Sequence, residues 1–409
     1  MSNKITIENL SLIFGKNKAR ATKMIEEGKS KSEILSKTGC NVAVRNANLS
    51  IAQGEIYVVM GLSGSGKSTL LRCINRLIEP TMGKVFVDDK EITKMDSKEL
   101  LNARRKELAM VFQHFGLLPH RSVMSNVAFG LELQGQPKEQ REKHARDTIE
   151  MVGLKGYEDL KVSELSGGMQ QRVGLARGLA NDPKVLLMDE AFSALDPLIR
   201  AQMQDELLLL QETMKKTIVF ITHDLEEAIK LGDKIAIMKD GEVVQIGTPE
   251  EIVTNPADDY VKSFVENVDR TKITTASSIM FSKPKLARLK KDGPSLVLKT
   301  MRENGTNILP VVRTNRTFLG FIHIEDVLKL KNEGAKSIET AVKETVMCVS
   351  PDTLIQDMLP LLSKTNHAIP VVDESNYLMG VVSLTSLIAE TTGKDKGEIN
   401  SIIQKAIEL

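Results

Sequence analysis

The chain has 409 residues, more than one ordinary hydrophobic core needs, and its 41% hydrophobic and 27% charged residues are typical of a folded globular protein, not a disordered or fibrous one. Its 55 basic and 54 acidic side chains nearly cancel, so the overall charge gives no reason to expect nucleic acid or a membrane surface as the main partner. The three cysteines are odd in number and form no CxxC pair, which argues against a disulfide framework or a zinc site.

Neither a targeting segment nor a membrane span is evident. The first ten residues, MSNKITIENL, lack the basic and then apolar pattern of a signal peptide. No apolar run approaches the roughly 20 residues that span a bilayer. We therefore expect a protein of a reducing cytosol, and if it serves a membrane, other chains must cross that membrane.

The chain is expected to open with a strand over residues 5–14. A polar stretch follows at residues 16–38, and its apolar residues Ala21, Met24 and Ile25 have helical spacing. This stretch looks like an insertion.

An α/β core is expected between this insertion and about residue 266. A second pair of strands is predicted over residues 42–51 and 55–60. The second member of that pair is apolar and stops at a glycine, as a buried parallel strand that feeds a loop does. Apolar strands then alternate with helical segments, which is the pattern of an α/β core. Further strands are predicted over residues 108–112, 185–188, 217–221 and 234–239.

A phosphate-binding loop is predicted at residues 61–68, GLSGSGKS, which match GxxxxGK[ST] between a strand and a helix expected over residues 69–77. Its glycines let backbone N–H groups face phosphate oxygens at a helix N-terminus. Lys67 would reach the β and γ phosphates, and Ser68 would bind Mg²⁺. The candidate ATP-binding residues here are Gly61, Ser63, Gly64, Ser65, Gly66, Lys67, Ser68 and Thr69.

Two adjacent carboxylates, Asp189 and Glu190, end the apolar strand VLLMDE, at the edge of an α/β sheet where ligands bind. Successive strand side chains point to opposite faces, so the two carboxylates can have different roles. We expect Asp189 to serve the metal and Glu190 to accept or orient the proton of the attacking water.

A third motif, LSGGMQQ at residues 165–171, resembles the signature of ABC ATPases, a family in which ATP lies between the P-loop of one subunit and the signature of another. The resemblance covers about residues 1–266 and implies an α/β P-loop ABC ATPase cassette with a helical subdomain at about 115–180. On spacing alone, a helix-capping role for His223 is the alternative to the family role. The family roles are adenine stacking for Phe14, the Q-loop and Mg²⁺ for Gln113, the D-loop for Asp196, and catalysis at the γ-phosphate for His223 together with Glu190 and Lys67.

The signature residues indicate a second anion-binding cradle. Ser166, Gly167 and Gly168 precede a helical stretch, so their N–H groups can face a γ-phosphate, and Gln170 belongs to the same motif. Each chain has one P-loop and one signature. The simplest complete site therefore needs a homodimer or a pair with a closely similar subunit.

The rest of the chain contains an internal repeat. LPVV at residues 309–312 recurs as IPVV at residues 369–372, eight residues before a glycine in each copy, at a constant offset of 60. Each copy is predicted to form strand, turn, strand and helix, and the pair resembles tandem CBS domains in an α+β module. The expected segments are a linker at 267–282, a module at 283–393 with repeats at about 277–333 and 341–393, and a C-terminal helix at 394–409.

Seven basic residues and no acidic one lie between Arg270 and Lys291. We expect this run to be regulatory: anionic lipid would attract it, and salt would screen that attraction within about 10 Å at 0.1 M. A solvated helix face and drift between the repeats are the alternatives. The candidate regulatory residues are Lys283, Lys285, Arg288, Lys290 and Lys291.

An early insertion followed by CBS repeats resembles the ABC subunits that energise import of glycine betaine, proline betaine and related osmoprotectants. The resemblance implies ATP hydrolysis with Mg²⁺, two membrane permease subunits, an extracytoplasmic substrate-binding protein, and a peripheral position on the cytoplasmic face of the membrane. Uptake of choline, carnitine or another amino-acid-like solute is the runner-up. A soluble non-transport ABC ATPase is the other alternative, although such proteins usually carry two cassettes or a long coiled coil.

An adenine nucleotide or a cyclic dinucleotide is a second hypothesis for what the repeats sense, since many CBS modules bind one. The sequence supports it weakly, because neither HIED at residues 323–326 nor SLTS at residues 383–386 shows the full [ST]xxD pattern.

Apolar residues close to Gln113 suit a groove that receives a helix of a membrane subunit. These residues are Phe115, Leu117 and Leu118, and core packing is the alternative explanation for them.

Overall fold

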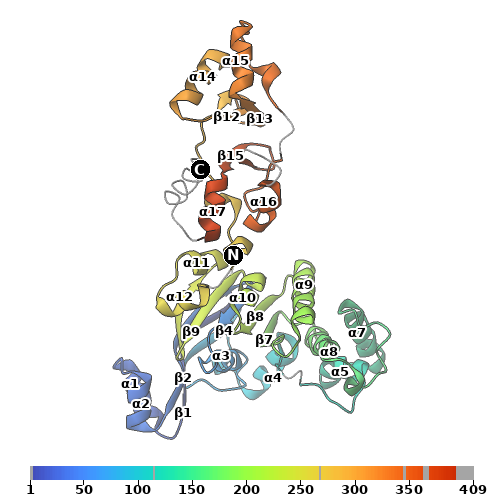
Figure 1. Ribbon diagram of the computed structural model, residues 1–409. Coiled ribbons are helices and arrows are strands. Elements are labelled where there is room, and N and C mark those ends of the chain that lie inside the picture. Colours follow the sequence, from blue (N-terminus) through green and yellow to red (C-terminus); the bar gives the residue numbers. More distant parts are fainter. Residues whose placement is uncertain (1–2, 114–115, 267–268, 344–346, 363–367, 393–409) are drawn as a thin grey trace. The chain divides into compact units, whose positions relative to one another are not determined.

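The computed structural model describes residues 3–113, 116–266, 269–343, 347–362 and 368–392 (Figure 1). The chain divides into two compact units, Met1–Val268 and Asp269–Leu409, and each is described by itself. Within the described residues, no helix is both long enough and apolar enough to cross a membrane.

A mostly parallel sheet forms the centre of the first unit. Its strands are β3 (Ile56–Met60), β6 (Leu108–Val111), β7 (Val185–Asp189), β8 (Thr217–Thr222), β9 (Lys234–Lys239) and β10 (Glu242–Gly247). The order is β10-β9-β3-β8-β7-β6, and only the edge pair of β9 and β10 is antiparallel. Every residue of β3, β7 and β8 is buried, as expected for parallel strands covered on both faces. The predicted α/β fold is confirmed.

A four-stranded antiparallel sheet packs on the same core. Its strands are β1 (Asn3–Phe14), β2 (Asn41–Ala52), β4 (Met82–Val87) and β5 (Lys90–Glu91), in the order β2-β1-β4-β5. The prediction that strands 42–51 and 55–60 form a pair is wrong, because β2 pairs with β1 whereas β3 lies between β8 and β9. The burial patterns explain the difference: β2 largely alternates between buried and more exposed residues, as a strand covered on one face does.

The insertion forms two helices, α1 (Lys18–Glu26) and α2 (Lys31–Thr38). Ala21, Met24 and Ile25 are buried in one cluster with Ile34, so the helical spacing in the sequence marks the packed face. Ser30 begins α2 with a capping box, which satisfies two free backbone donors.

The other helices of the first unit lie around the parallel sheet and in a separate group. They are α3 (Lys67–Ile74), α4 (Ser97–Lys106), α5 (Val123–Val127), α6 (Phe129–Leu133), α7 (Lys138–Met151), α8 (Gly167–Leu179), α9 (Pro197–Met214), α10 (Leu225–Leu231), α11 (Pro249–Thr254) and α12 (Asp259–Val265). Where the sequence predicts a helical subdomain, α5, α7 and α8 pack against one another (Figure 1). The helix predicted over residues 69–77 begins earlier, at Lys67. It also ends earlier, at Ile74, because Arg76 has a positive φ of 53° and breaks the helix.

The second unit contains the predicted repeat. Its main elements are α13 (Ala276–Ile279), β11 (Ala287–Arg288), α14 (Pro294–Glu303), β12 (Ile308–Val312), β13 (Phe318–His323), α15 (Ile324–Asn332), α16 (Ile355–Leu362), β14 (Ile369–Val372), β15 (Leu378–Val382) and α17 (Leu384–Thr392). Pro310 pairs with Phe321 in the first hairpin, and Pro370 pairs with Val381 in the second. Both partners keep the offset of 60, so the repeat is confirmed at the level of strand register.

The segment expected as a linker belongs largely to this second unit. Ala276 and Ile279 are buried in the core of the second repeat with Ile369 and Val382. The start of the tail thus completes the core of its distant half, which a search for local repeats does not reveal. Residues 267–268 and the expected C-terminal helix 394–409 lie outside the described residues.

Candidate functional site

The glycine-rich loop 61–68 joins β3 to α3 at the carboxyl end of the strand. Gly66 precedes α3 with a φ of 103°, and no side chain caps the helix. The first N–H groups of an uncapped helix have no intrahelical partner and attract anions. Ser65 adds a buried hydroxyl without a hydrogen-bond partner in the described part of the chain. These unsatisfied donors fit a phosphate chain. Of the other predicted residues here, Ser63 and Gly64 are exposed and Thr69 is half-buried.

Two glycines of this loop are required by close backbone approach. A Cβ at Gly61 would collide with the carbonyl oxygen of Met238, and one at Gly66 would collide with that of Ala43. Both glycines also have positive φ, which side chains disfavour. The loop therefore presents its backbone, and no side chain larger than hydrogen fits at these two positions.

The Lys67 ammonium group is held inside the loop. Its Nζ donates hydrogen bonds to the carbonyl oxygens of Gly61 (2.8 Å) and Leu62 (3.1 Å) and lies 3.8 Å from Oε1 of Glu190. Burial lowers the pKa of Lys67, and the nearby carboxylates of Glu190 and Asp189 oppose that shift. The cation thus lies within the loop that would hold the phosphates.

Asp189 is buried at the end of β7 and faces α3. Its carboxylate accepts hydrogen bonds from Ser68 Oγ at 2.7 Å and from Arg72 Nη2 at 3.1 Å. Hydroxyl and carboxylate oxygens are ligands that Mg²⁺ prefers, so Ser68 and Asp189 fit the metal. Gln113, the third predicted ligand, forms no hydrogen bond to either of them among the described residues.

Glu190 lies where three motifs meet. Its Oε2 accepts a hydrogen bond from Gln113 Nε2 at 3.2 Å and is 3.6 Å from Nδ1 of His223, while Lys67 approaches its Oε1. The φ of Glu190 is 47°, a conformation that costs a non-glycine residue on the order of 1 kcal/mol. Tertiary contacts hold this conformation, since the N–H of Glu190 donates to the carbonyl oxygen of Ile221 at 3.1 Å. The structure therefore brings three other predicted site residues together around the Glu190 carboxylate.

The signature residues form a second helix start. Ser166 precedes α8, and its hydroxyl accepts a hydrogen bond from the N–H of Met169 at 3.4 Å. Gly167 is exposed, whereas a Cβ at Gly168 would be 2.7 Å from Cγ2 of Ile199. Gln170 Nε2 donates to the carbonyl oxygen of Leu165 at 3.1 Å. The cradle is exposed and is oriented by its own hydrogen bonds.

The D-loop is anchored to α9. Asp196 caps this helix by accepting a hydrogen bond from the N–H of Ile199 at 3.1 Å. Arg200, one turn later, donates to the carbonyl oxygens of Phe192 (3.2 Å) and Leu195 (2.9 Å). The loop between β7 and α9 is therefore held in a defined conformation by an arginine that the sequence motifs do not include.

Phe14 and the apolar residues near Gln113 have surfaces open to partners. Phe14 ends β1 and is 45% exposed, which suits an aromatic ring that stacks on a ligand. Leu117 and Leu118 are half-buried. Phe115 lies outside the described residues, so the predicted groove is only partly described.

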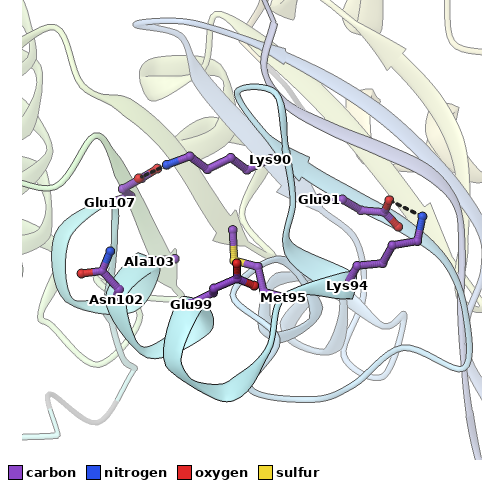
Figure 2. Close-up of a pocket in the computed structure, with 8 residues that line it drawn as sticks. All are labelled: Lys90, Glu91, Lys94, Met95, Glu99, Asn102, Ala103 and Glu107. Carbon is purple, nitrogen blue, oxygen red and sulfur yellow. Dashed lines mark hydrogen bonds and ion pairs between the residues drawn. The ribbon is translucent and has the colours of Figure 1, made fainter.

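A hollow of about 410 Å³ elsewhere on this unit does not involve the site. Figure 2 shows its lining residues, which come from β5, from α4 and from the residues that directly follow each of them. Ion pairs join Lys90 to Glu107 (2.8 Å) and Lys94 to Glu91 (2.7 Å). None of the motif residues lines it. Across the described part of the chain, no group of three or more His, Cys, Asp or Glu side chains could hold a metal ion. The motif residues Lys67, Glu190 and His223 lie instead close to the ends of β3, β7 and β8.

Arg72 and Tyr260, like Arg200, support the site and were not predicted from the sequence, whereas Ser193 lies in the predicted D-loop with Asp196. Arg72 binds Asp189, and its spacing of four from Ser68 on α3 is a signal that could have revealed it. Ser193 accepts a hydrogen bond from Gln113 at 3.3 Å. The hydroxyl of Tyr260 accepts one from the P-loop N–H of Leu62 at 3.4 Å. Tyr260 is distant in sequence, and no local pattern marks it.

Comparisons with known proteins agree with these motifs. The family described as ABC transporter matches residues 44–193, and the CBS domain matches residues 294–333 and 336–392. The glycine betaine/carnitine transport ATP-binding protein GbuA of Listeria monocytogenes is 51% identical over 96% of this chain and 98% of its own length. The glycine betaine transport ATP-binding protein OpuAA of Bacillus subtilis is 47% identical over 96% of this chain and 93% of its own length.

A solved structure resembles the first unit. It is the dimeric structure of an ATP-binding cassette in a post-hydrolysis state, bound to ADP and Pi. This cassette is 33% identical, with a TM-score of 0.51, and the match covers 60% of this chain and 98% of that one.

Proposed function

The chain belongs to the family of ATP-binding subunits of ABC transporters that carry tandem CBS domains, and from this premise we propose that it energises uptake of a quaternary-amine osmoprotectant such as glycine betaine or proline betaine. ATP hydrolysis coupled to transport is the activity of this family of subunits. The finer substrate assignment rests on one observation: GbuA and OpuAA, the two relatives above that are named for glycine betaine transport, each align with 96% of the chain, tail included.

The site geometry supports a division of roles among the motif residues. The P-loop N–H groups and Lys67 bind the β and γ phosphates, with Phe14 stacked on the adenine. Ser68 and Asp189 hold Mg²⁺, which neutralises charge on the phosphates when it is bound. Gln113 is proposed as a further ligand of the ion, and it also contacts Glu190.

Glu190 is proposed to orient the attacking water, because its carboxylate already faces His223 and Lys67. His223 is proposed to contact the γ-phosphate. Hydrolysis has little covalent work for a base, so positioning and electrostatic stabilisation are expected to carry most of the rate.

A homodimer is proposed to complete each site. The exposed cradle at Ser166, Gly167 and Gly168 would bind the γ-phosphate held by the partner's P-loop, with Gln170 and Asp196 at the same interface. The dimeric structure of the similar cassette supports this arrangement. Two permease subunits and an extracytoplasmic substrate-binding protein are the further proposed partners, with this chain peripheral on the cytoplasmic face of the membrane.

Regulation by the tail is the second part of the proposal. The ATPase motifs are all in the first unit, which leaves the second unit for control. The basic residues Lys283, Lys285, Arg288, Lys290 and Lys291 would respond to ionic strength at an anionic membrane, or the repeats would bind an adenine nucleotide or cyclic dinucleotide.

The test is betaine uptake and ATP hydrolysis by the reconstituted complex in anionic liposomes while internal salt is raised. Native activity should rise with salt, the Glu190→Gln complex should be inactive, and neutralisation of the five basic residues should remove the salt response. Normal ATP hydrolysis without betaine uptake at any salt concentration would contradict the assignment of betaine as the substrate. Uptake of choline and carnitine in the same liposomes would then test the alternative substrates. Carnitine is supported by the name of the Listeria relative, which includes it.

A further inference from the structure

A hollow of about 530 Å³ in the second unit has a charged lining that is entirely basic. Lys283, Arg288 and Lys291 come from the basic run, and Arg313 and Arg316 come from the turn between β12 and β13. These two arginines are not neighbours of the basic run in the sequence, because Arg313 lies 22 positions after Lys291. Five positive charges around one hollow repel one another, and an anion would relieve that repulsion.

Among the residues that the structure describes, these five cations have no carboxylate partner in an ion pair. Other basic residues of the same unit do form ion pairs, such as Lys343 with Asp326. Asp292 lies nearby, but its carboxylate accepts a hydrogen bond from the backbone N–H of Arg288 at 2.7 Å. The buried Nε of Arg316 has no hydrogen-bond partner in the described part of the chain, and such an unsatisfied donor is costly unless a ligand supplies an acceptor.

The internal repeat provides a matched comparison for this turn. Arg316 has a φ of 62°, and Asn376, at the same place 60 residues later, has a φ of 58°. Asparagine tolerates this left-handed conformation better than arginine does. Arg313 corresponds to Asp373, whose carboxylate accepts hydrogen bonds from two N–H groups of its own turn. The first turn, RTNR, thus has two positive charges at the positions where the second turn has an aspartate and an asparagine, and its own local hydrogen bonds come from Asn315.

The first turn also touches the second repeat. The carbonyl oxygen of Arg316 accepts a hydrogen bond from the N–H of Leu378 at 3.1 Å, and its guanidinium lies 5.4 Å from the ring centre of Tyr377. Leu286, in the lining of the hollow, packs on a cluster that contains Leu378. A ligand held by Arg316 would therefore be sensed where the two repeats join.

We propose that this hollow binds a phosphate-bearing anion, with Arg313 and Arg316 as its main ligands and Lys283, Arg288 and Lys291 around them. This inference names a ligand class for the regulation proposed for the tail. Binding itself is argued independently, and only its effect on transport rests on the proposed function. The ligand is either a free phosphate compound or the headgroup of an anionic lipid, since both present the same oxygens. Arginine suits both because its planar fork donates two parallel hydrogen bonds to such a group.

The test uses the full chain with Tyr377→Trp, which places the only tryptophan of the protein next to Arg316. Titration with inorganic pyrophosphate should change its fluorescence in a saturable way. Arg313→Gln with Arg316→Asn should weaken binding roughly 10- to 100-fold. Asparagine is chosen because it keeps the left-handed backbone. The matched control is Lys285→Gln with Lys290→Gln, which removes equal charge from the same basic run outside the hollow and should leave binding within about twofold.

Two further arms decide the source of the phosphate and protect the test. If vesicles of phosphatidylglycerol are used in place of pyrophosphate and their binding depends on Arg313 and Arg316 in the same way, the ligand is a lipid headgroup. Calorimetry on the chain with native Tyr377 should lose the corresponding heat in the arginine variant. Equal weakening by both double variants, or no saturable signal with either probe, would overturn the inference. Salt-dependent uptake could still be intact in that case, so failure here is distinct from failure of the proposed function.

Discussion

The two units each present an anion-binding region, and the two regions are built differently. In the first unit the donors are backbone N–H groups of a glycine loop, with Lys67 only 5% exposed. In the second unit the donors are long side chains, of which Lys283, Arg288 and Lys291 are exposed. A buried, preorganised site depends on backbone geometry, whereas exposed cations are screened within about 10 Å at 0.1 M salt. The first design suits catalysis, and the second suits sensing.

The largest expected effect is on hydrolysis at the preorganised site. Glu190→Gln should lower the rate of phosphate release about 100-fold or more, because the variant loses the group that orients water, while ATP binding persists. Glu226→Gln, an exposed carboxylate on α10, is the control and should hydrolyse ATP at the native rate. Native activity in Glu190→Gln would refute its proposed role.

Two glycines of the phosphate-binding loop should respond differently to substitution by alanine. Gly66→Ala should abolish measurable ATP binding, since the new methyl group collides with the Ala43 carbonyl. Gly64→Ala has positive φ but nothing within 4 Å of the new atom, so it should cost only about 1 kcal/mol of stability. Equilibrium nucleotide binding and thermal unfolding of both variants measure this difference. Similar losses in both would contradict a steric requirement at Gly66.

Salt should separate the two regions. Raising ionic strength from about 0.05 M to 0.5 M should weaken pyrophosphate binding at the tail roughly tenfold, because its cations are exposed. Binding of the nucleotide at the P-loop should weaken by less, since backbone donors and a buried lysine supply it. The Tyr377→Trp signal and a fluorescent ATP analogue report the two sites. Parallel salt curves would show that the distinction in burial has no consequence.

The smallest effect concerns a buried carboxylate that links α9 to α10. Glu227 accepts a hydrogen bond from Gln204 Nε2 at 3.1 Å. The pKa of Glu227 is raised, and burial is the main cause. Hydrogen bonds from Thr222 and Gln204 and the charge of Arg200 oppose this shift, whereas the charge of Asp224 adds to it. The folded state therefore holds this proton more readily than the unfolded chain. Its stability contribution is present below the unfolded pKa and is lost as pH rises through the folded pKa.

Glu227→Gln should remove that pH dependence and keep the free energy of unfolding at pH 7 at least native, because an amide needs no charge in the interior. Glu227→Ala should lose about 1–2 kcal/mol by leaving Gln204 unpaired. Denaturant unfolding at pH 4 to 8 measures both. If the free energy of unfolding of Glu227→Gln depends on pH as that of the native protein does, another group causes the dependence.

Local motifs and the family resemblance were sufficient to predict which residues of the first unit lie close together at the candidate site. Lys67, Asp189 and Glu190 were predicted from short patterns and His223 from the family resemblance. The structure places Lys67 and His223 next to the Glu190 carboxylate, and Ser68 next to Asp189. Their positions follow from the strand end that each one is close to, and strand ends can be predicted from apolar runs. Arg200 and Tyr260 were missed because they support the site from distant segments without a motif of their own.

The sequence by itself determined the α/β cassette, its phosphate loop, its carboxylate pair and the 60-residue repeat of the tail, because each depends on neighbouring residues or on a fixed period. Only the tertiary structure decided that β2 pairs with β1, that Ala276 belongs to the core of the second repeat, and that Arg313 and Arg316 join the basic run around one hollow. These contacts join segments far apart in the chain, and no local pattern encodes which distant surface a segment will cover.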